Sequence, residues 1–175
     1  MISQLMSEMI NRQINAELWS AYLYQAMSLD LESKNLSGMA KWFSVQAQEE
    51  LQHAHSLEAY LNGQNAKVEL FAIDKVPTSW STPLEMMEAA LDHEMAVTEM
   101  INNLMKQANK EQDFATQHKL MQFVDEQMEE EALFHSMVYK FRETQRNPCL
   151  TRILDQQMHS RKLEQKIQGR AEHWL

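Results

Sequence analysis

The sequence predicts an all-α domain, an antiparallel four-helix bundle with a long crossover between its second and third helices, followed by a short fifth helix. Three observations lead to this prediction. The 175 residues include only three glycines and three prolines, and strand-forming residues alternate over no convincing length. Helix-favouring residues dominate, and four long stretches carry apolar residues at helical spacing. We expect a single domain over residues 1–175, with the bundle in 3–145 and the fifth helix and tail in 147–175.

The first helix is expected from about Ser3 to Ser33. A short turn then leads into a second helix, with Ser37 as a candidate cap, that ends near Gly63. Residues 64–81 lack a helical stripe but contain several apolar side chains. This segment is therefore expected to cross from one end of the bundle to the other and to pack against its side, anchored by a tryptophan just before the third helix.

The later helices have clear start signals. Thr82 can cap the third helix, with Pro83 at the first helical position and Glu85 completing a capping box. Asp113 can cap the fourth helix, and Asn147 can cap the short fifth helix. Short turns separate the first helix from the second and the third from the fourth, which favours two antiparallel hairpins.

Composition excludes several classes of protein. The formal net charge of −9 argues against a general nucleic-acid surface. No apolar run approaches the roughly 18 residues of a membrane helix, so no membrane partner is expected. The start of the chain lacks the pattern of a secretion signal, and Cys149 is the one cysteine, so no internal disulfide is possible. We expect a cytoplasmic protein.

Polar residues interrupt the apolar stripe of each long helix. In chain order they are Glu17, then Glu50 and His53, then Glu94, then Gln127 and Glu130. The stripe glutamates of the first two helices are 33 positions apart, and His53 follows three later. Glu94, Gln127 and Glu130 repeat these two spacings after a shift of 77. Two related hairpins would bring all six polar side chains to one level of the core.

Four carboxylates and one imidazole in a bundle core predict a metal site. Like charges repel strongly where water is excluded, so such carboxylates must take up protons or bind cations. Oxygen and imidazole ligands suit iron, manganese or zinc, and the ligand types alone do not choose among these metals. A hydrogen-bonded network without metal remains the alternative interpretation.

The polar residues and their neighbours resemble the motifs of bacterial non-haem ferritins. The matching residues are Glu17 and Tyr24, Gln48-Glu49-Glu50-x-x-His53, Glu94, and Glu126-Gln127-x-Glu129-Glu130. The resemblance covers nearly the whole chain. It implies a ferritin-like fold, a ferroxidase centre at which dioxygen oxidises Fe(II), and a hollow shell of 24 identical subunits that stores ferric mineral.

The resemblance also implies a role for each matching residue. The first iron would be held by Glu17 and His53, and Glu50 would bridge to a second iron. The second iron would be held by Glu94 and Glu130, with Gln127 as a near neighbour. A third iron site beside the pair would use Glu49, Glu126, Glu129 and Glu130. Tyr24 would act as a hydrogen-bond partner or electron donor, and no haem is expected.

The chain departs from the family pattern in two places. Gln122 stands where some members carry an aromatic residue near the centre. The basic tail is longer than usual after about Gln165, and since the fifth helix of ferritins lines a fourfold channel, this tail could alter that opening. The chain is basic from about Arg161 onward, with Lys162, Lys166 and Arg170, and no role is assigned to these charges.

Other functions compete with ferritin. Bacterioferritin would show Glu-x-x-His on the fourth helix, where this chain has Gln127 and Glu130, and a haem-binding Met near Gln52. Rubrerythrin would need more cysteines. A di-iron oxidase for an organic substrate and a metal-free helical scaffold remain open. The other histidines are expected at the surface or at subunit interfaces; they are His55, His93, His118, His135, His159 and His173.

Overall fold

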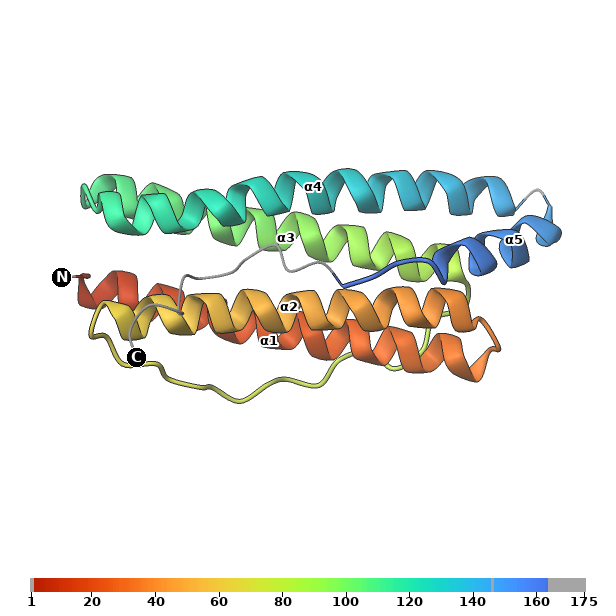
Figure 1. Ribbon diagram of the computed structural model, residues 1–175, viewed down its shortest axis with the longest axis horizontal. Coiled ribbons are helices and arrows are strands. Elements are labelled where there is room, and N and C mark those ends of the chain that lie inside the picture. Colours follow the sequence, from red (N-terminus) through yellow and green to blue (C-terminus); the bar gives the residue numbers. More distant parts are fainter. Residues whose placement is uncertain (1, 146, 164–175) are drawn as a thin grey trace.

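The structure is a computed structural model that describes residues 2–145 and 147–163. These residues form five α helices: α1 (Gln4–Ser33), α2 (Ser37–Gly63), α3 (Pro83–Lys110), α4 (Phe114–Thr144) and α5 (Pro148–Met158). Figure 1 shows the four long helices side by side, the crossover from α2 to α3 running back along the bundle, and α5 at one end. The predicted all-α bundle, its long crossover and its short fifth helix are therefore confirmed.

Side-chain caps begin four of the five described helices. In each case the cap oxygen accepts a backbone N–H from the first turn; the caps are Ser3, Thr82, Asp113 and Asn147. The expectation that Ser37 caps α2 is wrong, because the cap position is Leu36, whose side chain makes no such bond. The start of α2 is held from outside instead, since Asp155 of α5 accepts the backbone N–H of Met39 at 2.9 Å.

The crossover follows the expectation only in part. Trp80 is buried as the predicted anchor, and its backbone N–H donates to the side chain of Asp30 at 3.3 Å. Val76 is buried as well. Earlier in the segment, Asn11 binds the backbone on both sides of residue 68, through Lys67 O at 3.0 Å and Glu69 N at 2.8 Å. Val68 packs against the core, whereas the apolar residues that follow are exposed on the single chain. They are Leu70, Phe71 and Ile73.

The core consists of two apolar clusters separated by polar residues. Each long helix contributes to both clusters, and its polar stripe residues fall between the two contributions. On α4, Phe123 belongs to one cluster and Phe134 to the other, with Gln127 and Glu130 between them. Burial of the apolar clusters on both sides offsets the cost of holding a polar layer away from water.

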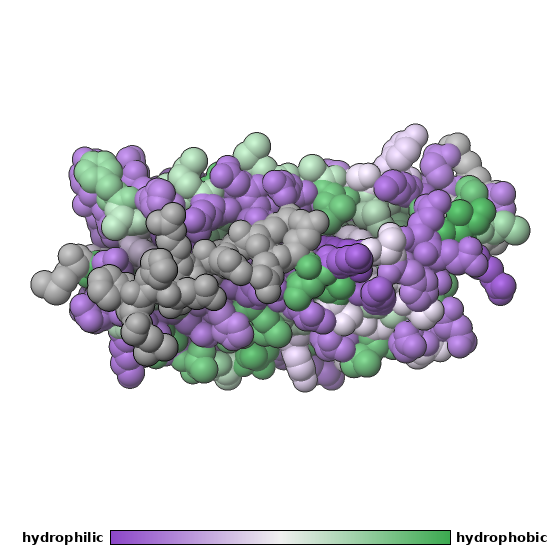
Figure 2. Space-filling view, viewed as in Figure 1, coloured by the Kyte–Doolittle hydropathy of each residue, from purple (hydrophilic) through white to green (hydrophobic). Residues whose placement is uncertain are grey.

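The surface of the bundle is largely hydrophilic on one face. Hydrophilic residues cover much of the face seen in Figure 2, with apolar residues in small groups among them. Across the described residues, none of the helices is both long enough and apolar enough to span a membrane. Of the tail and histidine residues named above, Lys166, Arg170 and His173 lie outside the described residues.

Candidate metal centre

The polar layer draws one or two side chains from each long helix. All six are buried, with exposed fractions of 6% or less. They are Glu17 of α1, Glu50 and His53 of α2, Glu94 of α3, and Gln127 and Glu130 of α4. The internal repeat in the sequence therefore predicted which residues share one level of the bundle.

The α1–α2 half of the layer has the geometry of a cation site. One ligand atom from each of Glu17, Glu50 and His53 lies within 4.8 Å of the others. His53 Nδ1 is 3.3 Å from Glu50 Oε2 and 4.0 Å from Glu17 Oε2. Gln13 donates to Glu17 Oε1 at 2.8 Å, whereas Glu17 Oε2 is buried and makes no hydrogen bond within the described part of the chain. A buried oxygen of this kind is suited to a metal ion.

The α3–α4 half is more fully hydrogen-bonded. Glu94 accepts from the Tyr24 hydroxyl and, at 3.1 Å, from the Gln127 side-chain amide. The two halves are joined by Gln46, whose Nε2 lies 3.0 Å from Glu130 Oε2 and 3.3 Å from Glu50 Oε1. One amide therefore contacts a carboxylate of each half.

The carboxyl groups of the layer have raised pKa values. Burial, and after it the negative charge of Glu50, raises the pKa of Glu17 to about 8. Burial and the charge of Glu94 raise the pKa of Glu130 to about 7. The pKa values of Glu50 and Glu94 are raised as well, with burial as the largest cause. Without a cation the layer holds protons, and a pair of divalent ions would supply the charge that these protons supply.

Burial and the neighbouring Glu94 also raise the pKa of the Tyr24 hydroxyl. Tyr24 therefore stays protonated at neutral pH and can donate its hydrogen bond to Glu94. Its ring packs between Phe43 and Phe134, at centroid distances of 5.8 and 5.9 Å. Tyr24 thus contacts Glu94, one of the residues expected to hold the second iron.

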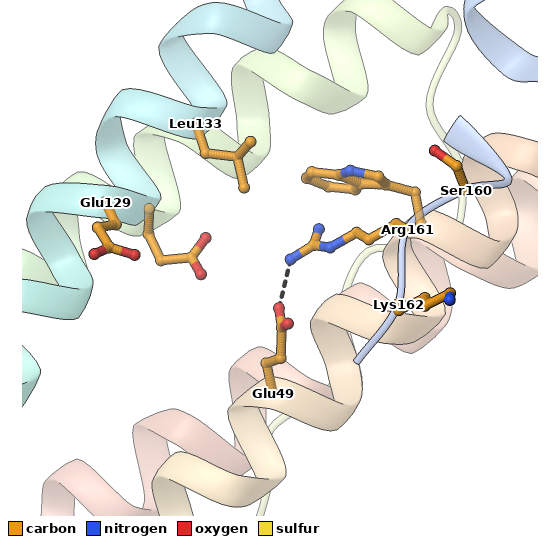
Figure 3. Close-up of a pocket in the computed structure, with 8 residues that line it drawn as sticks. Glu49, Glu129, Leu133, Ser160, Arg161 and Lys162 are labelled. Carbon is orange, nitrogen blue, oxygen red and sulfur yellow. Dashed lines mark hydrogen bonds and ion pairs between the residues drawn. The ribbon is translucent and has the colours of Figure 1, made fainter. Parts of the chain in front are cut away.

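Of the four residues expected to form the third site, Glu130 belongs to the polar layer itself, and the other three differ in burial. Glu49 is buried, Glu126 is half-buried and Glu129 is exposed. Glu49, Glu129 and Glu130 line a cavity of about 590 Å³, part of which is drawn in Figure 3. The structure thus places three of the four expected residues around one cavity, and Glu126 is not among its lining residues.

Sequence reasoning missed some contacts of the layer. Gln13 was not singled out, and Gln46 was placed in the buried stripe without a contact, although each stands four positions before a stripe glutamate of its own helix, the spacing at which helical side chains meet. His93 is half-buried on the single chain, and its expected place at the surface or at a subunit interface stays a prediction. Its Nε2 lies 2.7 Å from Ser20 Oγ, and burial lowers its pKa to about 4. Its ring is 5.1 Å from that of Trp19 and 6.0 Å from that of Tyr24.

Comparison with known proteins decides the family. The model of the ferritin-like domain matches residues 7–144. The chain belongs to the ferritin family. It is 42% identical over 142 residues to a bacterial non-heme ferritin of Bacteroides fragilis strain 638R, covering 81% of this chain and 89% of that one. A bacterial non-heme ferritin of Campylobacter jejuni is 34% identical over 142 residues, covering 81% and 85%.

Solved structures agree with this assignment. The open pore ferritin of Archaeoglobus fulgidus superposes with a TM-score of 0.91 at 39% identity, covering 93% of this chain and all of the other. The resemblance to bacterial non-haem ferritins that the motifs indicated is confirmed. In this ferritin, the cluster of Glu17, Glu50 and His53 is a candidate site for iron.

Proposed function

We propose that this ferritin oxidises Fe(II) to Fe(III) with dioxygen in its buried polar layer. The Fe(III) is stored as ferric oxyhydroxide inside a homo-oligomeric shell of 24 subunits, so iron is both substrate and cargo. The observation that carries the proposal is the set of four buried carboxylates with one imidazole at one level of a ferritin bundle. Raised carboxyl pKa values support it, because they mark a site that lacks positive charge.

Each half of the layer receives one Fe(II) ion. The first ion is bound by Glu17 and His53, and Glu50 bridges to the second. The second ion is bound by Glu94 and Glu130, with Gln127 beside it. Two Fe(II) ions held side by side supply two electrons to one dioxygen molecule. Hard carboxylate oxygens favour Fe(III) over Fe(II), so this ligand set makes oxidation more favourable.

The remaining residues position the ligands and pass iron onward. Tyr24 orients Glu94 through its hydrogen bond. We assign a third ion position to Glu49, Glu126, Glu129 and Glu130, between the paired ions and the cavity. The amide of Gln127 binds an ion less firmly than a carboxylate would, which favours departure of Fe(III) from the second position.

The proposal is tested by stopped-flow absorbance. Anaerobic apoprotein loaded with two Fe(II) per chain is mixed with dioxygen, and the growth of ferric absorbance is followed. We expect rapid oxidation that is lost in Glu50→Gln and retained in Glu99→Gln, a matched control that removes an exposed carboxylate from α3. Oxidation no faster than in protein-free buffer would contradict the proposal.

A further inference from the structure

A cationic side chain from the end of the described chain reaches the carboxylates beside the metal centre. Arg161 follows α5 by three residues, and its Nη2 forms an ion pair with Glu49 of α2. Its guanidinium carbon lies 4.1 Å from the centre of the Trp42 ring. Figure 3 shows Arg161 directed at Glu49, with Glu129 of α4 on the other side of the cavity. Both partners of the ion pair have side chains at most 15% exposed.

Packing of α5 on α2 fixes where Arg161 arrives. Besides the bond from Met39 N to Asp155, Lys41 Nζ donates to the backbone carbonyl of His159 at 2.7 Å. Gly38 allows the close approach of the two helices, because a Cβ at this position would overlap the carbonyl of Asp155. These contacts lie within a few residues of Arg161 and hold the segment that carries it.

Arg161 shares its cavity with more than one carboxylate, since Glu129 and Glu130 line it together with Glu49. Lys162 also lines the cavity but is exposed. Arg161 therefore supplies positive charge at the point where Glu49 and Glu130, two residues of the proposed third ion position, come together.

Only part of the Arg161 guanidinium is hydrogen-bonded to the carboxylate of Glu49. An arginine can grip a carboxylate with two parallel hydrogen bonds. Here Nη2 binds Glu49, but Nη1 is buried and makes no hydrogen bond within the described ranges. A buried donor without an acceptor weakens the docked state. A divalent ion brings twice the charge to the same carboxylates and can therefore compete with the guanidinium.

We propose that Arg161 is the resident cation of the third ion position and that a metal ion must displace it to bind there. The inference rests on the proposed metal centre, which it extends to this chain's own C-terminal segment. While Arg161 is docked, the cavity carboxylates are partly neutralised and the position has a low affinity for ions. The paired sites therefore fill first, and the third fills only at higher ion concentration.

The test is a titration of the assembled apoprotein with Zn²⁺, a redox-inert probe, by isothermal calorimetry and equilibrium dialysis. Wild type is compared with Arg161→Gln, which removes the charge and keeps a polar side chain. Lys162→Gln is the matched control, since it removes the neighbouring charge. We expect two tighter ions per chain in all three proteins and a third ion bound roughly tenfold more tightly in Arg161→Gln alone.

The outcomes separate this inference from the proposed centre. If wild type binds two ions but the affinity of the third is the same in Arg161→Gln, the inference is wrong and the centre stands. If wild type fails to bind the first two ions, the centre itself is wrong, and the inference falls with it. Crystals soaked in Zn²⁺ give a second readout. Anomalous density near Glu49 with Arg161 moved away supports displacement, and density there with Arg161 still on Glu49 contradicts it.

Discussion

The two hairpins of the bundle carry the same polar spacing but different chemistry. In the α1–α2 half, Glu17, Glu50 and His53 place three ligand atoms within 4.8 Å of one another. In the α3–α4 half, the residues at the equivalent positions are Glu94, Gln127 and Glu130. The second half has the amide of Gln127 where the first has the carboxylate of Glu50, and this amide donates a hydrogen bond to Glu94.

This difference implies two unequal ion positions. The first half offers a carboxylate oxygen without a hydrogen bond in the described chain, Glu17 Oε2, although an ion that binds His53 Nδ1 replaces its contact with Glu50 Oε2. In the second half an ion must compete with Tyr24 and Gln127 for Glu94. The first position should hold its ion firmly, whereas the second should bind and release ions more readily, as a centre that passes iron to a store requires.

The largest expected effect comes from truncating one polar side chain of each half. His53→Ala removes the imidazole of the first position and should slow oxidation of Fe(II) by roughly 100-fold. Gln127→Ala removes only an amide and should slow it less than roughly threefold. Stopped-flow absorbance with two Fe(II) per chain measures both rates. Equal losses of oxidation rate in the two variants would contradict a firm first position and a weaker second one.

A second change should make the halves more alike. Gln127→Glu places a carboxylate where the repeat puts Glu50 in the other hairpin. A fifth carboxyl group in the polar layer should lower the free energy of unfolding of the ion-free protein by about 1–3 kcal/mol. It should also tighten the second ion, so added Zn²⁺ should raise the Tm of Gln127→Glu more than that of wild type. Differential scanning calorimetry measures both effects, and Gln122→Glu, at an exposed position of the same helix, is the control.

The sequence predicts the structural features that depend on residues close together in the chain, or on the repeat between the two hairpins. Helix starts at Thr82, Asp113 and Asn147 were correct because a cap needs only its own first turn. The six layer residues were found because a repeat in sequence becomes a shared level in two hairpins. Ser37 failed as a cap because the start of α2 is bound by α5, more than 100 positions away in sequence.

The contacts that sequence reasoning could not supply depend on how α5 packs. Arg161 and Glu49 are 112 positions apart, and nothing in either local pattern pairs them. The exposure of Leu70, Phe71 and Ile73 likewise follows from no local pattern of the sequence. By contrast, the amides of Gln13 and Gln46 could have been found, since each lies four positions before a buried glutamate.

The pH dependence should reflect the protons that the layer holds. With pKa values of about 8 for Glu17 and about 7 for Glu130, both carboxyls bind protons near pH 7 that metal ions must displace. Calorimetry in buffers of different ionisation enthalpy should therefore show release of roughly one or more protons per chain at pH 7, and fewer at pH 9. No change in proton release between these pH values would contradict the raised pKa values.

The same groups affect the stability of the ion-free protein. Glu17 has an ordinary pKa of 4.5 and a folded-state pKa of about 8, so between these values the folded chain binds more protons than the unfolded chain. The contribution of Glu17 to stability is therefore complete below pH 4.5 and is lost as the pH rises towards 8. Saturating Zn²⁺ should reverse this trend, because ions bind the deprotonated carboxylates.

The smallest expected effects come from the two positioning amides. Among the described residues, Gln13 donates a side-chain hydrogen bond to Glu17 alone, whereas Gln46 contacts Glu50 and Glu130 and so touches both halves. Gln13→Leu should weaken the first Zn²⁺ ion by roughly threefold and leave the second unchanged. Gln46→Leu should weaken both ions by a similar factor, because one amide orients a carboxylate on each side. Stepwise affinities from calorimetry distinguish these outcomes. A loss confined to one ion in Gln46→Leu would mean that the halves are positioned independently.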